Sequence, residues 1–201
     1  MVRDRLPELL TALRQHAHLH SSEHYYDVRG REPHDAVDLA AWMLYVNKAG
    51  YNGLFRVNRQ NGFNVPFGRN PSVNIVQEEN LSACSAALQS AQITYQPYSA
   101  IEPAKSDFVY FDPPYAPMTD TSFLRYSADG FSEKDQQQLA AFATKLHRKG
   151  VRVMLSNSDT PLIRRLYAAA HFQIAAVEAP RLVNCKPDGR GGAAEVIITN
   201  Y

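Results

Sequence analysis

The sequence is poor in cysteine and has no long apolar run, and both absences limit the class of protein it can encode. Its two cysteines, Cys84 and Cys185, belong to no metal-like or redox-like pair, which argues against a disulfide framework. No run of about 18 apolar residues occurs, so no membrane span is predicted, and the first residues lack the apolar core of a signal peptide. We therefore expect a reduced, cytoplasmic protein.

Acidic residues are absent between Asp38 and Glu78, although the whole chain carries a net charge of only +1. The near-neutral total gives no sign of nucleic-acid binding, but this stretch holds four basic residues: Lys48, Arg56, Arg59 and Arg69. A local excess of positive charge is what phosphate contact requires, and a solvated surface can show the same excess. Charge alone leaves both interpretations open.

The most informative stretch is an apolar run that ends in a carboxylate, a pair of prolines and a tyrosine. Phe108 to Phe111 is predicted to be a buried strand that a proline stop terminates. Proline fixes its own φ and disfavours helix in the residue before it, so Asp112, Pro113 and Pro114 form a stiff corner. In an open α/β sheet, ligands bind at the carboxyl ends of the strands, where this corner lies.

These residue types suit the activation of an exocyclic amine on a nucleobase, whose lone pair is delocalised into the ring. The Asp112 carboxylate and a proline carbonyl can accept its N–H bonds and stabilise the positive charge that develops during attack on an electrophilic methyl group. Tyr115 can stack on a base that has left the duplex. The alternative is a strand that stops at a proline turn with a surface tyrosine. All four residues in order favour the first interpretation.

Downstream patterns place this corner in an α/β fold. Ser132 is predicted to cap a helix that ends near Gly150, and residues 151–155 form the next strand of a βαβ unit. Because such crossovers bring the strand ends to one edge, Ser156 and Asn157 should lie beside Asp112. A helix that starts after Thr160 and two further strands, at 172–177 and 194–199, complete the predicted fold. Residues 118–130 and 186–192 are predicted to be connections.

Four histidines follow or end the first predicted helix, which spans residues 5 to about 17: His16, His18, His20 and His24. Spacings of two do not share a helix face, and no cysteine or carboxylate set accompanies them, so a metal site is not predicted. We expect these histidines to be surface residues.

Residues 51–69 are dense in asparagine, glycine and aromatic residues, and Asn-Gly-type turns frame them. Arginine can read guanine, asparagine can read adenine, and exposed aromatic rings can fill the gap left by an extruded base. An ordinary β-hairpin with core aromatics has the same composition. Composition alone leaves a DNA-reading segment and an ordinary hairpin equally open.

Together these residues resemble the Dam-type DNA adenine-N6 methyltransferases over nearly the whole chain. The matching segments are Tyr25-Tyr26-x-x-Arg29, the run from Tyr51 to Asn58, Phe63-Asn64-Val65-Pro66-Phe67-Gly68, Asp112-Pro113-Pro114-Tyr115-Ala116-Pro117, Ser156-Asn157 and the ending Glu195-x-x-x-x-Asn200-Tyr201. The resemblance implies an α/β fold with a partial Rossmann-like methyltransferase sheet. It also implies a mainly helical target-recognition region at 1–92, with a recognition hairpin at 50–69, and the C-terminal part of the catalytic domain at 93–201.

By this resemblance, the protein transfers a methyl group from S-adenosylmethionine to N6 of a flipped adenine in double-stranded DNA, at a GATC-like target. Asp112 then holds the amine, Tyr115 stacks on the base, and Phe111 and Asp112 contact the cofactor. The catalytic residues implied are Asp112, Pro113, Pro114 and Tyr115. The DNA-binding residues implied are Tyr51, Asn52, Leu54, Arg56, Asn58, Pro66 and Arg69. Among them, Tyr51 and Asn52 act near the flipped adenine, and Arg56 reads guanine.

The chain departs from the family in its cofactor segment. The family begins with a Trp/Ala-Gly-Gly-Lys segment and a strand ending in Phe-x-Gly-x-Gly, whose glycine loop cradles S-adenosylmethionine, and an acidic residue further on holds the ribose. Only Gly30 precedes residue 50 here, in no such pattern. We therefore expect a chain that corresponds to the C-terminal two-thirds of the enzyme and binds the cofactor weakly alone. Its implied partners are double-stranded DNA and an N-terminal segment supplied in cis or in trans.

Two other functions fit parts of the sequence. One is a non-catalytic DNA-binding remnant of such a methyltransferase, or one part of a split enzyme. Cofactor binding distinguishes the remnant from an active enzyme. The other is methylation of a different planar amide or amine, such as a glutamine side chain, against which residues 51–68 argue. A bacterial or phage-encoded enzyme of the first kind is expected in the cytoplasm, associated with the nucleoid.

Overall fold

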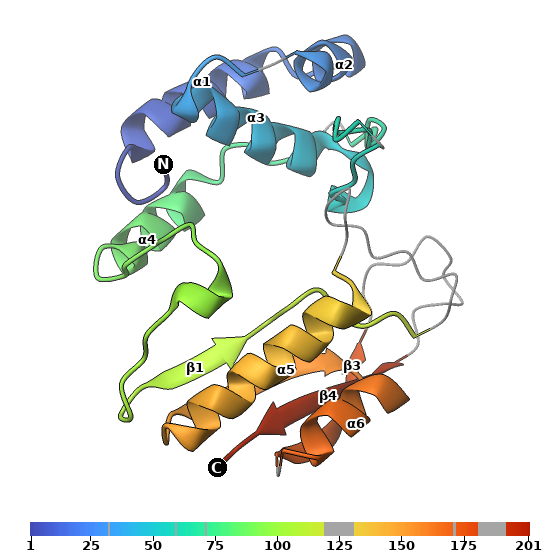
Figure 1. Cartoon of the computed structure of the whole chain (residues 1–201). Helices are drawn as coiled ribbons and strands as arrows, with labels where there is room; N and C mark the ends of the chain where they lie inside the picture. Colours follow the sequence, from blue (N-terminus) through green and yellow to red (C-terminus); the bar gives the residue numbers. More distant parts are fainter. Residues whose placement is uncertain (32, 59, 71, 119–130, 171, 181–191) are drawn as a thin grey trace. The chain divides into compact units, whose positions relative to one another are not determined.

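The computed structural model describes residues 1–31, 33–58, 60–70, 72–118, 131–170, 172–180 and 192–201 (Figure 1). The chain forms two compact units, Met1–Thr94 and Tyr95–Tyr201, which we call the helical unit and the sheet unit. Of the connections expected at 118–130 and 186–192, residues 119–130 and 186–191 lie outside the described residues. No helix in the described part of the chain is long and apolar enough to cross a membrane.

The described residues of the helical unit form α1 (Leu6–His18), α2 (Ser22–Gly30), α3 (Ala36–Ala49) and α4 (Glu78–Leu88). Ser21 and Asp35 cap α2 and α3 by accepting backbone N–H bonds in their first turns. Helix α3 contacts both α1 and α2, and α1 also contacts α4. Apolar side chains of these helices form one core, which includes Leu9, Leu13, Val28 and Val46.

The expectation that the histidines are surface residues is wrong for His16. This side chain is buried, its Nδ1 lies 3.1 Å from Nε2 of His24, and its ring stacks on Tyr45 with 4.7 Å between the centroids. The two histidines meet because α1 and α2 both pack on α3. Burial, with a smaller contribution from His24, lowers the pKa of His16 to about 4, so its imidazole is neutral at neutral pH.

The segment between α3 and α4 follows the path of a hairpin, and isolated bridges replace a continuous ladder. Gly50 pairs with Phe67 and Val57 pairs with Phe63, both in antiparallel sense. A short 3-10 helix, η1 (Tyr51–Gly53), follows α3 directly. A Cβ atom on Gly68 would lie 2.9 Å from the Ala49 carbonyl oxygen, so glycine is needed where the two ends of the segment approach each other.

The sheet unit contains a mixed sheet with the order β1-β2-β4-β3, formed by β1 (Phe108–Phe111), β2 (Arg152–Ser158), β3 (Gln173–Pro180) and β4 (Gly192–Thr199). Strands β1 and β2 are parallel and are joined through α5 (Glu133–Arg148), while β4 is antiparallel to both of its neighbours. Helix α6 (Pro161–Ala168) follows β2, and η2 (Tyr98–Ala100) precedes β1. The predicted βαβ unit and the α/β fold class are confirmed.

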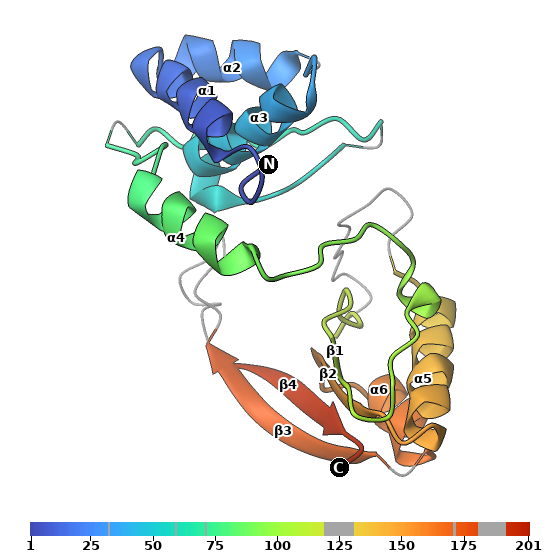
Figure 2. The same ribbon diagram turned by 90° about the vertical axis from the view of Figure 1, so that its left-hand side faces the viewer.

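Helices α5 and α6 lie on the same side of this sheet (Figure 2). Phe111 and Leu155 point toward them and are buried, whereas Phe108 and Tyr110 on the opposite face are 54% and 50% exposed. Successive side chains of a strand point to opposite faces, so a strand covered on one face buries only alternate residues. The expectation of a fully buried strand at 108–111 is therefore wrong for Phe108 and Tyr110. We call the face that carries these two rings the open face.

Candidate functional site

The predicted catalytic residues lie in a segment that starts at the end of β1, which we call the Asp112 corner (residues 112–117). Ser156 on β2 donates a hydrogen bond from Oγ to Asp112 Oδ1 over 2.9 Å. The hydroxyl of Tyr110 lies 2.9 Å from the same Oγ, and because Ser156 donates its proton to Asp112, Tyr110 is the donor in that pair. The prediction that Ser156 lies beside Asp112 is confirmed. The other carboxylate oxygen of Asp112, Oδ2, is not hydrogen-bonded to Ser156.

Tyr115 is half-buried within the corner. Burial raises the pKa of its phenol. The ring is therefore a neutral aromatic surface at physiological pH. A neutral ring with a polar edge suits stacking on a base.

The backbone of the corner is held by two buried amide side chains. Gln136, in the first turn of α5, donates from Nε2 to the Pro114 carbonyl oxygen over 2.9 Å. Asn157 donates from Nδ2 to Gln136 Oε1 over 3.1 Å, and its Oδ1 accepts the N–H groups of Ala116 and Ser158 at 2.8 and 2.9 Å. Asn157 and Gln136 are 0% and 1% exposed. Asn157 was predicted to lie near Asp112, whereas Gln136 was not among the predicted site residues.

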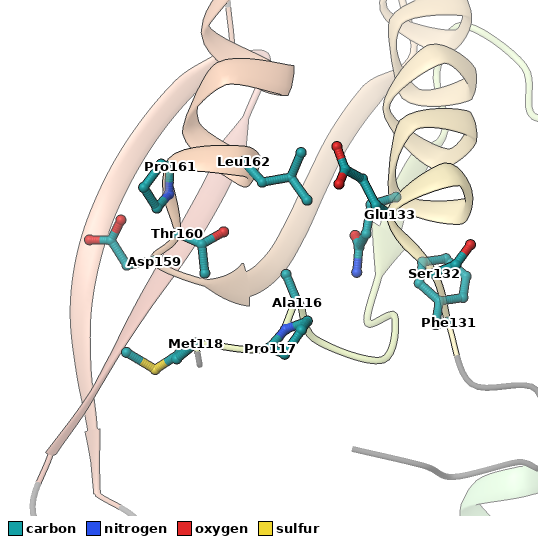
Figure 3. Close-up of a pocket in the computed structure, with 11 residues that line it drawn as sticks. Ala116, Pro117, Met118, Phe131, Ser132, Glu133, Asp159, Thr160, Pro161 and Leu162 are labelled. Carbon is teal, nitrogen blue, oxygen red and sulfur yellow. The ribbon is translucent and has the colours of Figure 1, made fainter. Parts of the chain in front are cut away.

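A pocket of about 430 Å³ lies on the helix-facing side of the corner, between the starts of α5 and α6 (Figure 3). Ala116 and Pro117 line it from the corner, Gln136 from α5 and Leu162 from α6. In Figure 3 the Leu162 side chain points toward this space and that of Asp159 points away from it. The described lining residues do not include Asp112 or Tyr115. The predicted catalytic side chains therefore face a different side of the corner from this pocket.

The predicted DNA-binding residues lie in the helical unit, on the segment between α3 and α4, which we call the 50–70 loop. Leu54 is half-buried, and the others are exposed: Tyr51, Asn52, Arg56, Asn58, Pro66 and Arg69. Asn52 and Arg69 have positive φ angles of 54° and 56°, so the chain turns sharply at both. Arg59 lies outside the described residues.

Arg56 is held in place by Asn64 from the opposite arm of the loop. Its Nε donates to Asn64 Oδ1 over 2.8 Å, and its Nη2 donates to the Asn64 carbonyl oxygen over 3.1 Å. A guanidinium group has further N–H donors on its Nη1–Nη2 edge. Arg56 is therefore pre-oriented while this edge stays able to make a bidentate contact.

The base of the loop is fixed by side chains from α2. Tyr25 donates from its hydroxyl to the Val65 carbonyl oxygen over 2.9 Å, and Arg29 donates from Nη1 to the same oxygen over 3.1 Å. At the tip, Asn58 Oδ1 accepts the backbone N–H groups of Gln60 and Gly62, each at 2.9 Å. The Asn58 amide oxygen therefore stabilises the turn of the loop.

The mixed sheet, with an acidic and proline-rich corner at its carboxyl edge, is consistent with a methyltransferase fold. Residues 1–182 match the family model described as D12 class N6 adenine-specific DNA methyltransferase. The chain belongs to this family. Membership implies an enzyme that uses a methyl donor and has DNA as its substrate.

Several named relatives are similar over most of the chain. The type II methyltransferase M1.LlaDCHI of Lactococcus lactis is 38% identical over 211 residues, which cover 100% of this chain and 74% of the relative. The type II methyltransferase M.MjaIII of Methanocaldococcus jannaschii is also 38% identical, over 98% of this chain and 73% of the relative. A DNA adenine methylase of Vibrio cholerae is 36% identical over 87% of this chain and 64% of the relative.

Proposed function

We propose that this protein is a DNA adenine-N6 methyltransferase whose reacting amine binds at the Asp112 corner. The observation that carries the proposal is the Asp112 carboxylate, held through Oδ1 by Ser156 at the end of β1 in a chain of the D12 family. A fixed carboxylate at the carboxyl edge of a sheet is placed to meet a substrate, and Tyr115 in the same corner offers a ring surface.

The corner offers acceptors for both N–H bonds of an exocyclic amine. Among the described residues, Asp112 Oδ2 has no hydrogen-bond partner. Pro114 already accepts a hydrogen bond from Gln136, which leaves the Pro113 carbonyl as the better second acceptor. Accepting both N–H bonds draws the nitrogen lone pair out of conjugation and stabilises the positive charge that develops on N6. We propose that Tyr115 stacks on the extruded adenine and orients it for this contact.

The 50–70 loop is proposed to read the DNA duplex. Arg56, held by Asn64, is the proposed guanine reader, while Leu54 and Pro66 are proposed to contact bases and Tyr51 and Asn52 to act near the flipped adenine. Arg69 is exposed at the end of the loop and is proposed to contact phosphate. A GATC-like sequence is the proposed target.

S-adenosylmethionine is the proposed donor of the electrophilic methyl group, and Asp112 and the backbone of Phe111 are the proposed contacts to it. The Phe111 side chain is buried in the core. These residues fit only one side of such a site, because no described residue of the sheet unit belongs to a glycine-rich turn that follows a strand. We therefore propose that further polypeptide, in cis or as a second chain, completes the donor site. The exposed rings of Phe108 and Tyr110 on the open face are a surface that it could cover.

Calorimetry with S-adenosylmethionine and size-exclusion chromatography test this completion. Residues 1–201 alone are expected to bind the donor weakly or not at all and to self-associate, because exposed strand edges and apolar faces recruit other chains. A segment that carries the family's glycine loop should restore both donor binding and monomeric behaviour. Tight donor binding by a clean monomer would contradict the proposal.

Product analysis tests the reaction itself. Duplex DNA is incubated with isotope-labelled S-adenosylmethionine and the protein, alone and with the completing segment, and the nucleosides are then identified by mass spectrometry. Labelled N6-methyladenine is the expected product. Label on cytosine, or on a protein glutamine in place of DNA, would contradict the proposed substrate. Duplex binding without any label transfer in either condition would instead favour a non-catalytic DNA-binding protein.

A further inference from the structure

We propose that Gln136 and Asn157 are positioning residues for methyl transfer. Together they fix the backbone on both sides of Tyr115, and hence the orientation of the Tyr115 ring and the Pro113 carbonyl toward the adenine. The inference rests on the proposed function of the Asp112 corner. It adds two residues that act through the corner without touching the substrate.

The prolines alone do not fix the shape of the corner. Pro113 and Pro114 lock their φ angles, and Pro114 also restricts the ψ angle of Pro113, but the ψ angle of Pro114 and both backbone dihedrals of Tyr115 are not set by the prolines. The prolines also lack N–H groups, so the backbone here cannot continue a strand ladder. The Pro114 carbonyl and the Ala116 N–H flank Tyr115, and both are bound by these two amides. Side-chain hydrogen bonds therefore supply the constraint that the backbone lacks.

The side-chain amides of Gln136 and Asn157 form a chain of hydrogen bonds in which the donor and acceptor roles are fixed; we call this chain the relay. Gln136 gives its NH₂ group to the Pro114 carbonyl and its oxygen to Asn157, whose own oxygen receives the Ala116 and Ser158 N–H groups. Neither amide can turn over without bringing two acceptors or two donors together. Because both are buried, such mismatched pairs would have no water to satisfy them. The relay therefore holds one arrangement of the corner.

The position of Gln136 on α5 supports a role beyond packing. The face of α5 that covers the sheet continues with apolar residues at Leu139, Ala140, Ala143 and Leu146, all buried. Gln136 lies on this face one turn earlier and is equally buried. An apolar residue there would extend the core, whereas an amide is of use only to the groups it binds, which are Asn157 and the corner.

Gln136→Glu tests the relay because ionisation of the introduced carboxyl removes the hydrogen bond to the Pro114 carbonyl. When protonated, the carboxyl donates to the Pro114 carbonyl and accepts from Asn157, as glutamine does. When ionised, it sets an acceptor against the Pro114 carbonyl. Burial raises the pKa of the introduced carboxyl. The carboxylates of Glu133 and Asp159, which line the same pocket, add to the rise, and their ion pairs with Arg165 and Arg164 reduce this addition.

We expect kcat of Gln136→Glu to fall about 10- to 100-fold, relative to wild type at the same pH, as pH rises through the pKa of the introduced carboxyl. The KM for DNA should change less than about twofold, because the proposed DNA-reading loop lies in the helical unit. Gln137→Glu is the matched control: Gln137 is exposed and donates to Glu133, so this variant should follow wild type at every pH.

Asn157→Asp is a second variant with a different expected pattern. The aspartate oxygen keeps the hydrogen bond from the Ala116 N–H, but it removes the donor to Gln136, which then turns its NH₂ group toward the aspartate and away from Pro114. We expect a similar loss of kcat with protection of the Ala116 amide retained. Circular dichroism confirms that each variant folds, and amide hydrogen exchange at Ala116 reports the relay without any turnover.

The outcomes separate this inference from the proposed function. The positioning role is overturned if wild type and Gln137→Glu are active and the kcat of Gln136→Glu, relative to wild type at the same pH, does not change with pH. If wild type yields no N6-methyladenine even with the donor site completed, the proposed function fails, and hydrogen exchange decides the relay. Faster exchange at Ala116 in Gln136→Glu, only where the introduced carboxyl is ionised, supports the relay, and unchanged exchange overturns it.

Discussion

The Asp112 corner and the 50–70 loop carry the proposed functional residues, and they are stabilised in opposite ways. The corner is held along its length by the nearly or fully buried side chains of Ser156, Gln136 and Asn157. The loop is fixed at its base by Tyr25 and Arg29, while its proposed DNA contacts are mostly exposed. Chemistry requires atoms fixed to within fractions of an ångström, whereas base reading requires side chains that extend from the surface.

This difference predicts two kinds of mutational effect. Changes at the corner should lower the rate of methyl transfer and leave DNA binding nearly unchanged. Changes in the loop should alter affinity or sequence discrimination and leave the chemical step nearly unchanged at saturating DNA. The following predictions test this separation, starting with the largest expected effect.

Asp112→Ala should abolish methyl transfer while duplex affinity stays close to wild type. Losing a well-placed acceptor for the developing charge costs about 3 kcal/mol or more, which is at least about a hundredfold in rate. Single-turnover methylation and DNA titration measure the two quantities. Glu178→Ala, which removes an exposed carboxylate from β3, is the control. Near-wild-type turnover by Asp112→Ala would show that the site is assigned wrongly.

Acid should destabilise the helical unit through His16. Its pKa is about 4 in the folded state and about 6.5 when unfolded, so between these values the unfolded chain binds more protons. This contribution is complete above about pH 6.5 and is lost as pH falls toward 4, at a cost of order 2–3 kcal/mol.

Urea unfolding of the helical-unit signal at neutral and acidic pH measures this loss. His16→Gln should flatten the pH dependence, and His18→Gln, at an exposed position, should keep it. An identical pH slope in wild type and His16→Gln would mean that other groups cause the acid sensitivity.

Arg56→Ala should cost about 1–3 kcal/mol of binding free energy on the preferred sequence and should remove discrimination at one base pair. The reason is the loss of a pre-oriented guanidinium edge held by Asn64. Binding titrations against duplexes with single-base changes measure the effect. An equal loss of binding free energy on every sequence would mean that Arg56 contacts phosphate and does not read a base.

Arg69→Ala should have the smallest effect and should weaken binding to all sequences alike. Removing one phosphate contact lowers the slope of log affinity against log salt by about 1 and leaves discrimination unchanged. Titrations at two salt concentrations are sufficient. A loss confined to one base pair would instead place Arg69 among the base-reading residues.

Much of the sheet unit could be predicted because its signals are local or follow from topology. The capping box of Ser132 with Asp135 starts α5 as its sequence pattern indicates. The parallel βαβ connection requires that β1 and β2 end at one edge, which is why Ser156 could be placed beside Asp112. The open face could not be foreseen, because a short apolar run does not reveal how many of its faces are covered.

The residues that were missed depend on packing between distant segments. Gln136 lies in a polar run that reads as a solvated helix start, and only the position of the corner shows that it is buried. Likewise, α2 was not predicted over Tyr25–Arg29, since its amphipathic pattern is weak, and His16 is buried by α3 rather than by any neighbour in sequence. The patterns in a single sequence do not show which distant segments pack against each other.

The most direct test of the account measures rate and discrimination in one assay. Single-turnover methylation of a preferred duplex and of its single-base variant is compared for wild type, Asp112→Asn and Arg56→Ala, with the donor site completed. The account predicts that Asp112→Asn slows both duplexes by the same factor and leaves their ratio unchanged. Arg56→Ala should lower that ratio and keep the rate at saturating preferred duplex. A changed ratio in Asp112→Asn, or a slowed chemical step in Arg56→Ala, would contradict the division of roles between the corner and the loop.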